Sequence, residues 1–422
     1  MAYSEDTKNT DDRKKISELC RVHLGGTPKT GEKEFWGGDI KWATAKDVAN
    51  LQGRYLTETE RRITEKGVNG SNAKVFPEGT IVITARGTVG KLAILGEPMS
   101  FNQTCYGLIP IPAIDKMYVF YALKNGISKI DELSYGTVFQ TITMKTFDEL
   151  EIRAPSLEQQ RRESKILSDL DTKIELNQQM NKTLESIAQA LFKHWFIDFE
   201  FPDENGQPYK SSGGEMVDSE LGEIPREWGV EHPKNIGKIV CGKTPSTKIS
   251  KNFGDDFPFI KIPDMRGMVF TENTEVKLSQ SGSESLPNRK LPPMTVCVSC
   301  IATPGLVTIT SVESYTNQQI NSIICKDKIS PFYVYLQMKT KKDEIFAKGS
   351  SGTSTLNLNT GEFSKIKILM PSPGVMDDFH KALRPMFKRI LYNQKESDTL
   401  TRIRDQLLPK LMSGKIRVPL EE

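Results

Sequence analysis

The sequence lacks the features that place a chain in a membrane or outside the cell. No run of about 18 apolar residues is present, so we expect no membrane-spanning helix. The N-terminal stretch MAYSEDTKNTDDRKK is polar and mixed in charge, unlike a secretory signal. The 6 cysteines follow no framework spacing, as is typical of a reducing compartment. We therefore expect a cytoplasmic protein without disulfides.

A strong charge of either sign is also absent. Lys and Arg number 57 against 54 Asp and Glu, which leaves a net charge of +3. This balance is compatible with nucleic-acid binding but does not argue for it, so any basic surface must be local. The length of 422 residues and the 37% hydrophobic content are ordinary for a globular protein of several domains.

Two short motifs suggest cofactor or metal sites, and neither has the context its chemistry needs. Residues Gly237 to Thr244 fit the pattern G-x-x-x-x-G-K-[ST], but Pro245 follows at once where a phosphate-binding helix should begin. Cys297 and Cys300 form one CxxC inside a strand-like segment, and a structural zinc site needs four ligands. We predict a solvated turn, buried cysteines, and no cofactor or metal bound to this chain.

A third motif leaves an enzymatic alternative open. Pro263-Asp264 followed by Glu275 and Lys277 fits the loose PD…ExK pattern of nucleases, in which two acids hold Mg²⁺. The first half of the chain has Asp47 at the corresponding place but no such lysine. A self-contained Mg²⁺-dependent nuclease is therefore the alternative, while Asp264 and Asp47 holding a loop is the structural explanation.

What the sequence does contain is one long helix pattern, present twice. From Pro155 to Phe199 the apolar residues recur every three or four positions without an internal Gly or Pro, which predicts a rod about 60 Å long. The same pattern returns 216 residues later, where Pro155 corresponds to Pro371 and Asn177 to Asn393. A constant offset that also preserves the Asn-Gln pair indicates duplication.

The segments before the two rods repeat as well. Gly25-Gly26-Thr27-Pro28 matches Gly242-Lys243-Thr244-Pro245, and Asn102-Gln103 matches Asn317-Gln318. Between such anchors the two copies differ almost everywhere. The strand-like segments and turns predict an α+β class: two duplicated mixed α/β domains separated by a long antiparallel two-helix coiled coil.

This organisation gives the following boundaries. We predict an N-terminal tail (1–15), a first domain (16–155), a long central helix (156–198), a linker (199–230), a second domain (231–371), a long C-terminal helix (372–413) and a tail (414–422). Asn177 and Asn393 fall near the midpoints of the rods. We expect them to lie close together and to fix the register of the coiled coil.

A shared frame with different loops is suited to reading two unlike targets in the same way. A DNA site with two unlike halves at a fixed spacing fits such a device. Two readings stay open beside it: a structural duplication that binds other ligands, and a coiled-coil scaffold with no nucleic-acid role.

The chain resembles the specificity subunit of type I restriction–modification systems over nearly its whole length. The matching segments are ELEIRAP before the first rod, LFKHWFIDFEFP (191–202), ENGQPYKSSGG (204–214), LGEIPREW (221–228) and LLPKLMSGKI (407–416), together with the duplication. The resemblance implies a non-catalytic bacterial or archaeal subunit whose target-recognition domains each read half of a bipartite site. It also implies helices that set the spacing and dock adenine methyltransferase subunits.

The same resemblance implies which partners carry the chemistry. S-adenosylmethionine, ATP and Mg²⁺ would bind only to the methyltransferase subunits and to a separate restriction and translocase subunit. For docking of the methyltransferase we predict the apolar residues at the rod ends: Phe192, Trp195, Phe196, Leu408, Leu411 and Met412.

Base reading requires Arg, Lys, Asn and Gln side chains on loops. The candidates for DNA contact in the first domain are Lys41, Lys46, Arg54, Arg86, Lys91 and Gln140. Those in the second domain are Lys261, Arg266, Asn288, Arg289 and Lys290. Asn102-Gln103 and Asn317-Gln318 recur despite different targets, which favours a structural or phosphate-binding role for these pairs.

Overall fold

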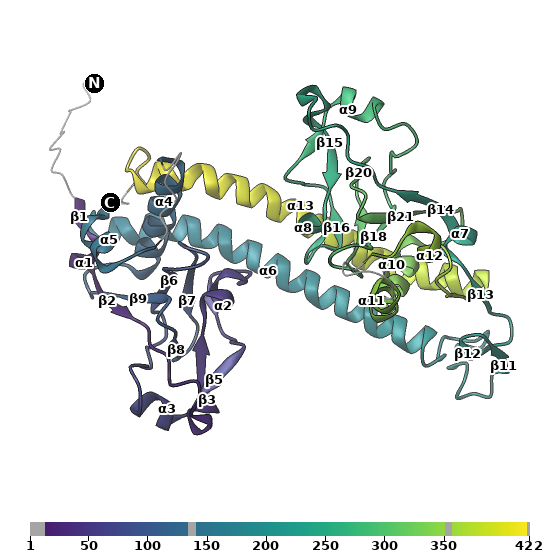
Figure 1. Ribbon diagram of the computed structural model, residues 1–422, viewed down its shortest axis with the longest axis horizontal. Coiled ribbons are helices and arrows are strands. Elements are labelled where there is room, and N and C mark those ends of the chain that lie inside the picture. The colour runs from purple at the N-terminus through teal and green to yellow at the C-terminus, as the bar shows by residue number, and fades with distance from the viewer. Residues whose placement is uncertain (1–12, 134–140, 351–356, 420–422) are drawn as a thin grey trace. The chain divides into compact units, whose positions relative to one another are not determined.

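The structure, a computed structural model, describes residues 13–133, 141–350 and 357–419. The candidate Gln140, the repeat anchors Gly136-Thr137 and Gly352-Thr353, and most of the N-terminal tail lie outside these ranges. The chain divides into two compact units. Unit 1 holds residues 1–176 and 397–422, and unit 2 holds residues 177–396. Each unit is described by itself (Figure 1).

Unit 1 contains a mixed α/β domain and parts of two long helices. Its strands are β1 (Arg13–Lys15), β2 (Cys20–Leu24), β3 (Trp36–Ala43), β4 (Tyr55–Leu56), β5 (Arg61–Ile63), β6 (Ile81–Thr84), β7 (Leu92–Leu95), β8 (Ser100–Phe101), β9 (Cys105–Pro110) and β10 (Glu151–Arg153). Its shorter helices are α1 (Ile16–Leu19), α2 (Ala45–Ala49), α3 (Glu65–Asn69), α4 (Lys116–Leu133) and α5 (Met144–Glu149). The strands form sheets in the orders β2-β9-β6-β7-β4, β5-β3-β8 and β1-β10.

Unit 2 contains a domain with the same plan. Its strands are β13 (Gly229–Glu231), β14 (Gly237–Cys241), β15 (Phe253–Ile260), β16 (Phe270–Thr271), β17 (Lys277–Leu278), β18 (Val296–Ser299), β19 (Val307–Thr310), β20 (Tyr315–Thr316), β21 (Ile320–Cys325) and β22 (Ile368–Met370). Its shorter helices are α7 (Pro233–Ile236), α8 (Ile262–Met265), α9 (Gln280–Glu284), α10 (Pro331–Thr340), α11 (Lys342–Ser350) and α12 (Thr360–Phe363). The sheet orders are β14-β21-β18-β19-β16, β17-β15-β20 and β13-β22.

The two sets of sheets correspond strand for strand, which confirms the predicted duplication. In each five-stranded sheet only the last strand is parallel to its neighbour: β4 pairs with β7, and β16 pairs with β19. In each three-stranded sheet the long strand carries an irregularity of register, between Trp36 and Ile40 in one unit and between Phe253 and Phe257 in the other. Two sequences that differ at most positions therefore form one frame.

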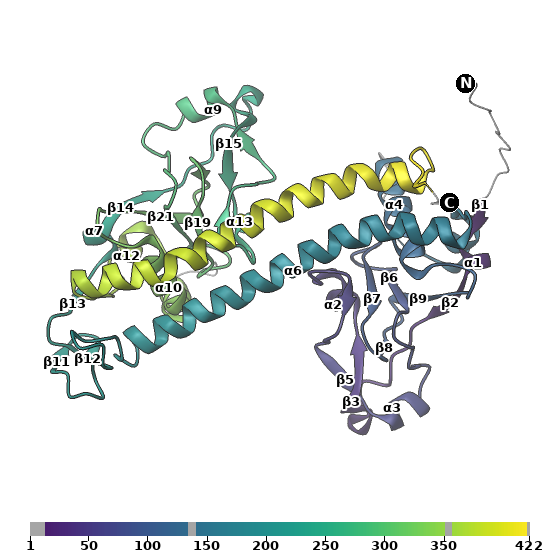
Figure 2. The same ribbon diagram turned by 180° about the vertical axis from the view of Figure 1, so that it is seen from behind.

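Within each unit the three-stranded sheet projects away from the long helices. In unit 1, β3, β5 and α3 form the end farthest from α6 (Figure 1). In unit 2, β15 and α9 form the end farthest from α13 (Figure 2). These projecting ends contain the loops at which the two sequences diverge.

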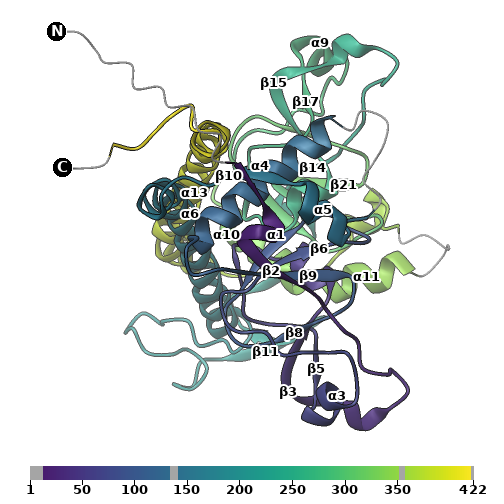
Figure 3. The same cartoon turned by 90° about the vertical axis from the view of Figure 1, so that its left-hand side faces the viewer.

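The two long helices are α6 (Leu157–Phe196) and α13 (Pro373–Met412), each of 40 residues. In unit 1 the first half of α6 shares a core with the end of α13 through Leu167, Leu408 and Leu411. In unit 2 the second half of α6 shares a core with the start of α13 through residues such as Phe192 and Leu383. The helices therefore pack antiparallel, and Figure 3 shows them side by side nearly end-on.

Two predicted boundaries need correction. Residues Arg13–Lys15, assigned to the tail, form strand β1 and pair with β10. The segment 199–230, predicted to be a linker, contains the hairpin of β11 (Met216–Ser219) and β12 (Gly222–Pro225). Its apolar residues Phe201, Ile224 and Trp228 are buried in the core of unit 2, so a polar composition concealed a packed element.

Among the described residues, no helix is both long and apolar enough to cross a membrane. The cysteines are free thiols, and Cys20, Cys105, Cys297 and Cys300 are buried. Burial raises the pKa of Cys297 to about 12 and that of Cys300 to about 11. The CxxC motif thus contributes buried apolar side chains to strand β18 and the residue after it, as predicted.

The first prediction concerns thiol reactivity. At pH 8 the four buried cysteines should resist alkylation by iodoacetamide in the native protein, because burial hinders both ionisation and access. Cys241, which is partly exposed, should be the first site labelled. Mass spectrometry of peptides from native and urea-unfolded protein measures this difference. Rapid native labelling of Cys297 would contradict the described core.

Candidate nucleic-acid interface

The turn that repeats in both units is built by backbone hydrogen bonds. The amide of Gly25 donates to the Cys105 carbonyl at 3.1 Å, and the amide of Gly242 donates to the Ile320 carbonyl at 3.0 Å. A Cβ on Gly25 would lie 2.2 Å from the Asn102 carbonyl oxygen, and one on Gly242 would lie 2.1 Å from the corresponding oxygen. Only glycine fits this close approach.

The repeated Asn-Gln pairs belong to this turn. The side chain of Asn317 accepts from the amide of Gln319 at 3.1 Å, as Asn102 does from Thr104. The hydroxyl of Thr244 donates to Gln318 at 2.7 Å, and that of Thr27 donates to Gln103 in the same way. These pairs hold the turn, which agrees with the structural role favoured by their repetition.

The P-loop pattern does not form a phosphate site. Gly237–Cys241 is strand β14, and the amide of Lys243 donates to the Thr316 carbonyl at 2.9 Å. No helix begins at Thr244, so the described loop offers no cradle of free amides.

Asp264 holds a loop, and Asp47 does the same in unit 1. One oxygen of Asp264 accepts from the Lys261 amide at 2.8 Å and the other from the Glu275 amide at 3.2 Å. Asp47 accepts from the amides of Thr44 at 2.7 Å and Glu60 at 3.1 Å. Across the described ranges, no cluster of three potential metal ligands occurs. Nothing in this geometry supports the nuclease alternative.

Two of the predicted DNA-contact residues of unit 1 are bound within the protein. Arg54 is 5% exposed and donates to several groups of α4 and α6. Lys41 is buried and donates to the Thr57 carbonyl at 2.5 Å, with an ion pair to Glu97 at 2.9 Å. Both leave the set of base-contact candidates, because their charged groups face protein partners rather than solvent.

The remaining described candidates of unit 1 lie at the surface. Lys46, on α2, is exposed and forms an ion pair with Glu60 at 2.8 Å. Arg86 and Lys91 are exposed in the turn between β6 and β7. The basic candidates of this unit therefore divide between the projecting part and the five-stranded sheet.

In unit 2 the candidates gather around α8 and the loop after α9. Arg266, Asn288 and Lys290 are exposed, whereas Lys261 is half-buried. Lys290 forms an ion pair with Glu313 at 2.7 Å. Arg289 donates to the Cys241 carbonyl at 2.7 Å, which ties the loop to β14, so its guanidinium is partly engaged.

One exposed arginine was missed by the sequence analysis. The guanidinium of Arg61, on β5, stacks 3.6 Å from the Trp36 ring, and Trp36 packs edge-on against Trp42 at 5.0 Å. Residues 25 positions apart meet because β3 and β5 pair in the sheet. The strand register puts Val276 at the place of Arg61 in unit 2, so this feature belongs to one repeat only.

The six residues predicted to dock a partner are buried in the protein's own cores. Phe192, Trp195 and Phe196 pack in unit 2 against Phe379 and Tyr333. Leu408, Leu411 and Met412 belong to the core of unit 1. These side chains are not available to a partner, so that prediction is corrected.

The two central asparagines meet as expected. The amide nitrogen of Asn177 lies 3.5 Å from the Asn393 carbonyl oxygen and donates to Glu396 at 2.7 Å. Asn393 donates to the side chain of Asn181 at 2.9 Å. Asn177 and Asn393 are both buried between the helices.

Comparison with known proteins identifies the repeated domain. A family model described as the type I restriction modification DNA specificity domain matches residues 10–186 and again residues 225–401. These two matches cover each globular domain together with most of the long helix that follows it.

Curated relatives carry the same description. The HindI specificity subunit of Haemophilus influenzae is 39% identical over 337 residues, covering 68% of this chain and 73% of its own length. The MjaIX specificity subunit of Methanocaldococcus jannaschii is 31% identical over 427 aligned residues, covering 96% of this chain and 94% of its own.

A solved structure agrees in fold. The type I restriction–modification S subunit from M. genitalium aligns with a TM-score of 0.58 at 16% identity and covers 98% of each chain. The chain therefore belongs to the family of type I restriction–modification DNA specificity domains, as a specificity subunit with two recognition domains.

Proposed function

We propose that each recognition domain reads one half of a bipartite DNA site, with unlike sequences in the two halves. The observation that carries this proposal is chemical difference at equivalent positions of one frame. The strand registers match Trp36 of unit 1 with Phe253, and Arg61 with Val276. A common scaffold with different exposed groups favours a common docking geometry and different base preferences.

The exposed basic and amide side chains are the proposed contacts. In unit 1 they are Arg61, Lys46, Arg86 and Lys91, and in unit 2 they are Lys261, Arg266, Asn288 and Lys290. A planar guanidinium can donate two hydrogen bonds to the O6 and N7 atoms of guanine. Because Trp36 already holds the Arg61 guanidinium in one plane, we assign Arg61 to base reading.

The long helices are the proposed spacer. Each is continuous over 40 residues, which corresponds to about 60 Å at 1.5 Å per residue. The buried Asn177 and Asn393 would fix their register, since displacement along the helix would leave buried amides without partners. Helix length and register together would then determine the gap between the half-sites.

We propose that methyltransferase subunits dock on apolar side chains exposed on the helices. Leu176 and Ile403, in unit 1, are 59% and 41% exposed. Tyr392 and Ile187, in unit 2, are 56% and 45% exposed. The offset of 216 maps Leu176 onto Tyr392 and Ile187 onto Ile403, so each unit presents one residue of each pair. Two equivalent apolar surfaces suit two copies of one partner.

This role assigns the chemistry to other chains. Methyl transfer from S-adenosylmethionine and ATP-driven translocation with Mg²⁺ would belong to the methyltransferase and restriction subunits. The present chain supplies the sequence preference and the geometry, working on double-stranded DNA in the cytoplasm of its bacterial or archaeal host.

Methylation mapping of a host genome carrying this gene and its methyltransferase tests the proposal. The expected motif has two specified halves, separated by unspecified base pairs. Removing one heptad from facing positions of both helices should shorten the gap by about three base pairs, since seven residues span about 10 Å. The half-site sequences should remain unchanged, and a change in them would contradict the spacer role.

A second prediction concerns base reading by Arg61. Arg61→Lys keeps the charge but loses the planar pair of donors, so it should relax one base pair of a single half-site by about 1–3 kcal/mol. Val276→Arg in the other repeat is a control for a general gain of charge. Methylation rates on duplexes with single substitutions measure the effect. Equal relaxation at every position would exclude base reading by this side chain.

A third prediction concerns partner docking. Ile187→Lys together with Ile403→Lys should weaken methyltransferase binding, because burying each isoleucine contributes about 1.5–3 kcal/mol. The corresponding loss is about one to two orders of magnitude in Kd per site. Ser186→Lys with Gln406→Lys places the same charges on exposed neighbouring positions. Calorimetric titration should show weak binding for the first pair only, and equal binding by both would refute docking at these residues.

A further inference from the structure

Strands β4 and β16 are the last strands of their five-stranded sheets. An edge strand leaves one side of its backbone without a strand partner, so these groups need another source of hydrogen bonds. In each unit one polar side chain on a long helix binds the backbone at this edge. We call these contacts the edge ties, and they consist of Glu175 with Arg54 in unit 1 and Gln394 with Phe270 in unit 2.

The tie in unit 2 is neutral. The amide oxygen of Gln394, on α13, accepts from the Phe270 amide at 3.2 Å. The amide nitrogen of the same side chain donates to the Phe270 carbonyl at 3.1 Å. One side chain therefore satisfies both backbone groups of one residue, as a neighbouring strand would.

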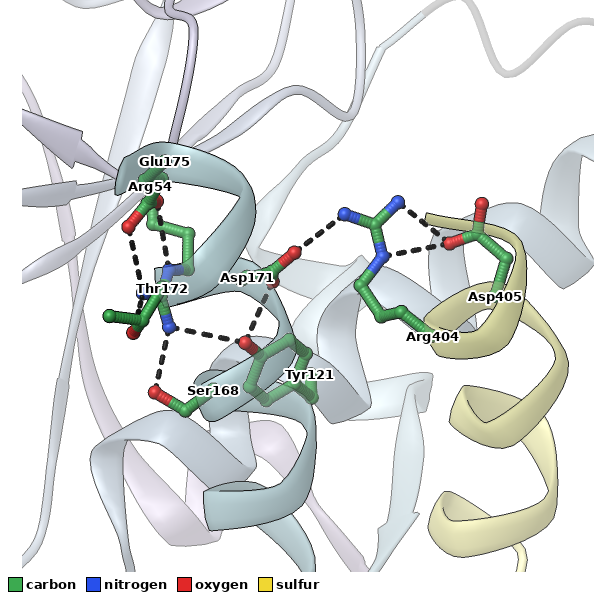
Figure 4. Close-up of polar contacts among 8 residues, drawn as sticks. All are labelled: Arg54, Tyr121, Ser168, Asp171, Thr172, Glu175, Arg404 and Asp405. Carbon is green, nitrogen blue, oxygen red and sulfur yellow. Dashed lines mark hydrogen bonds and ion pairs between the residues drawn. The ribbon is translucent and has the colours of Figure 1, made fainter. Parts of the chain in front are cut away.

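The tie in unit 1 is charged. One carboxylate oxygen of Glu175, on α6, accepts from the Arg54 amide at 2.8 Å and from its Nε at 3.0 Å. The other oxygen accepts from Nη2 of Arg54 at 2.8 Å. The guanidinium also donates to Ser168 at 2.7 Å and Thr172 at 2.8 Å on the same helix (Figure 4).

The charged tie extends to the second helix of unit 1. Arg54 contacts the Tyr121 hydroxyl at 3.3 Å, and this hydroxyl donates to Asp171 at 2.7 Å. Asp171 accepts from Arg404, on α13, at 2.6 Å (Figure 4). Burial and the neighbouring Asp171 raise the pKa of Tyr121, which keeps its hydroxyl protonated as a donor. The domain, α6 and α13 are thus joined by one polar chain.

The two ties are not copies of each other. The offset of 216 places Leu391 at the position of Glu175 and Gln178 at the position of Gln394, and Gln178 is exposed. Each repeat thus ties its edge strand with a different residue type, one helical turn apart. The contact is present in both units although its residues were not retained from the duplication.

Apolar packing alone does not determine how a domain is rotated or shifted on a helix, because it is non-directional. Hydrogen bonds are directional, and these ones bind backbone atoms of the recognition domain itself. We propose that the edge ties position each recognition domain on the helix pair, so that Glu175, Arg54 and Gln394 act with helix length in selecting the half-site gap. This inference rests on the proposed function.

The neutral tie allows the cleaner experiment. Gln394→Met keeps the side-chain volume and removes both hydrogen bonds without leaving a buried charge. Gln178→Met makes the same change at the exposed counterpart and serves as the matched control. Each chain is assembled with its methyltransferase, and methylation is measured on duplexes with native half-sites and gaps from two base pairs shorter to two longer.

The wild-type and Gln178→Met complexes should prefer the native gap, while Gln394→Met should lose about tenfold of that preference, as expected for two hydrogen bonds. Relaxation at other gaps, with both half-site sequences still required, would support the positioning role. An unchanged gap preference, or an equal loss of rate at all gaps, would overturn it. A general loss of stability would lower all rates together and leave the gap profile intact.

Unit 1 provides an independent check. Glu175→Gln retains one acceptor for the Arg54 amide and should have a smaller effect on the gap than Arg54→Met with Glu175→Met, which removes the whole tie. The reverse order would count against the inference. If the wild-type complex itself shows no gap preference, the proposed bipartite function fails, and that result is distinct from failure of the ties.

Discussion

The rest of the structure depends on the antiparallel packing of α6 and α13. Each helix contributes half of its length to each unit, so neither domain has a complete core without both helices. Asn177 and Asn393 interrupt this apolar contact with buried amides that find partners on the facing helix. Buried amides in a helical interface favour one register, because any shift leaves polar groups unsatisfied.

The duplication separates what is kept from what varies. Glycine turns, loop-holding aspartates and the order of the strands recur because each is required by backbone geometry in both units. The exposed groups on the projecting sheets do not recur, as the contrast of Arg61 with Val276 illustrates. A specificity subunit needs this division, since its frame must dock the same partner twice while its surfaces distinguish different base pairs.

The sequence predicted the features that depend on periodicity and repetition. The long helices, the duplicated α+β domains and the proximity of Asn177 to Asn393 all followed from spacing along the chain. The function of buried polar residues did not. Arg54 is charged and follows a glycine, so it resembled a surface residue until its contacts with Glu175 showed otherwise. Trp195 and Leu411 resembled docking residues because a sequence does not show which apolar helix positions the chain covers itself.

The central claim is that one frame carries two independent readers. A chain in which the second domain, residues 231–371, replaces residues 16–155 before α6 tests it most directly, with methylation mapping of the complex as the measurement. The account predicts methylation of a symmetric site made of two inverted copies of the second half-site. Methylation of the original asymmetric site, or a symmetric site made from the first half-site, would contradict it.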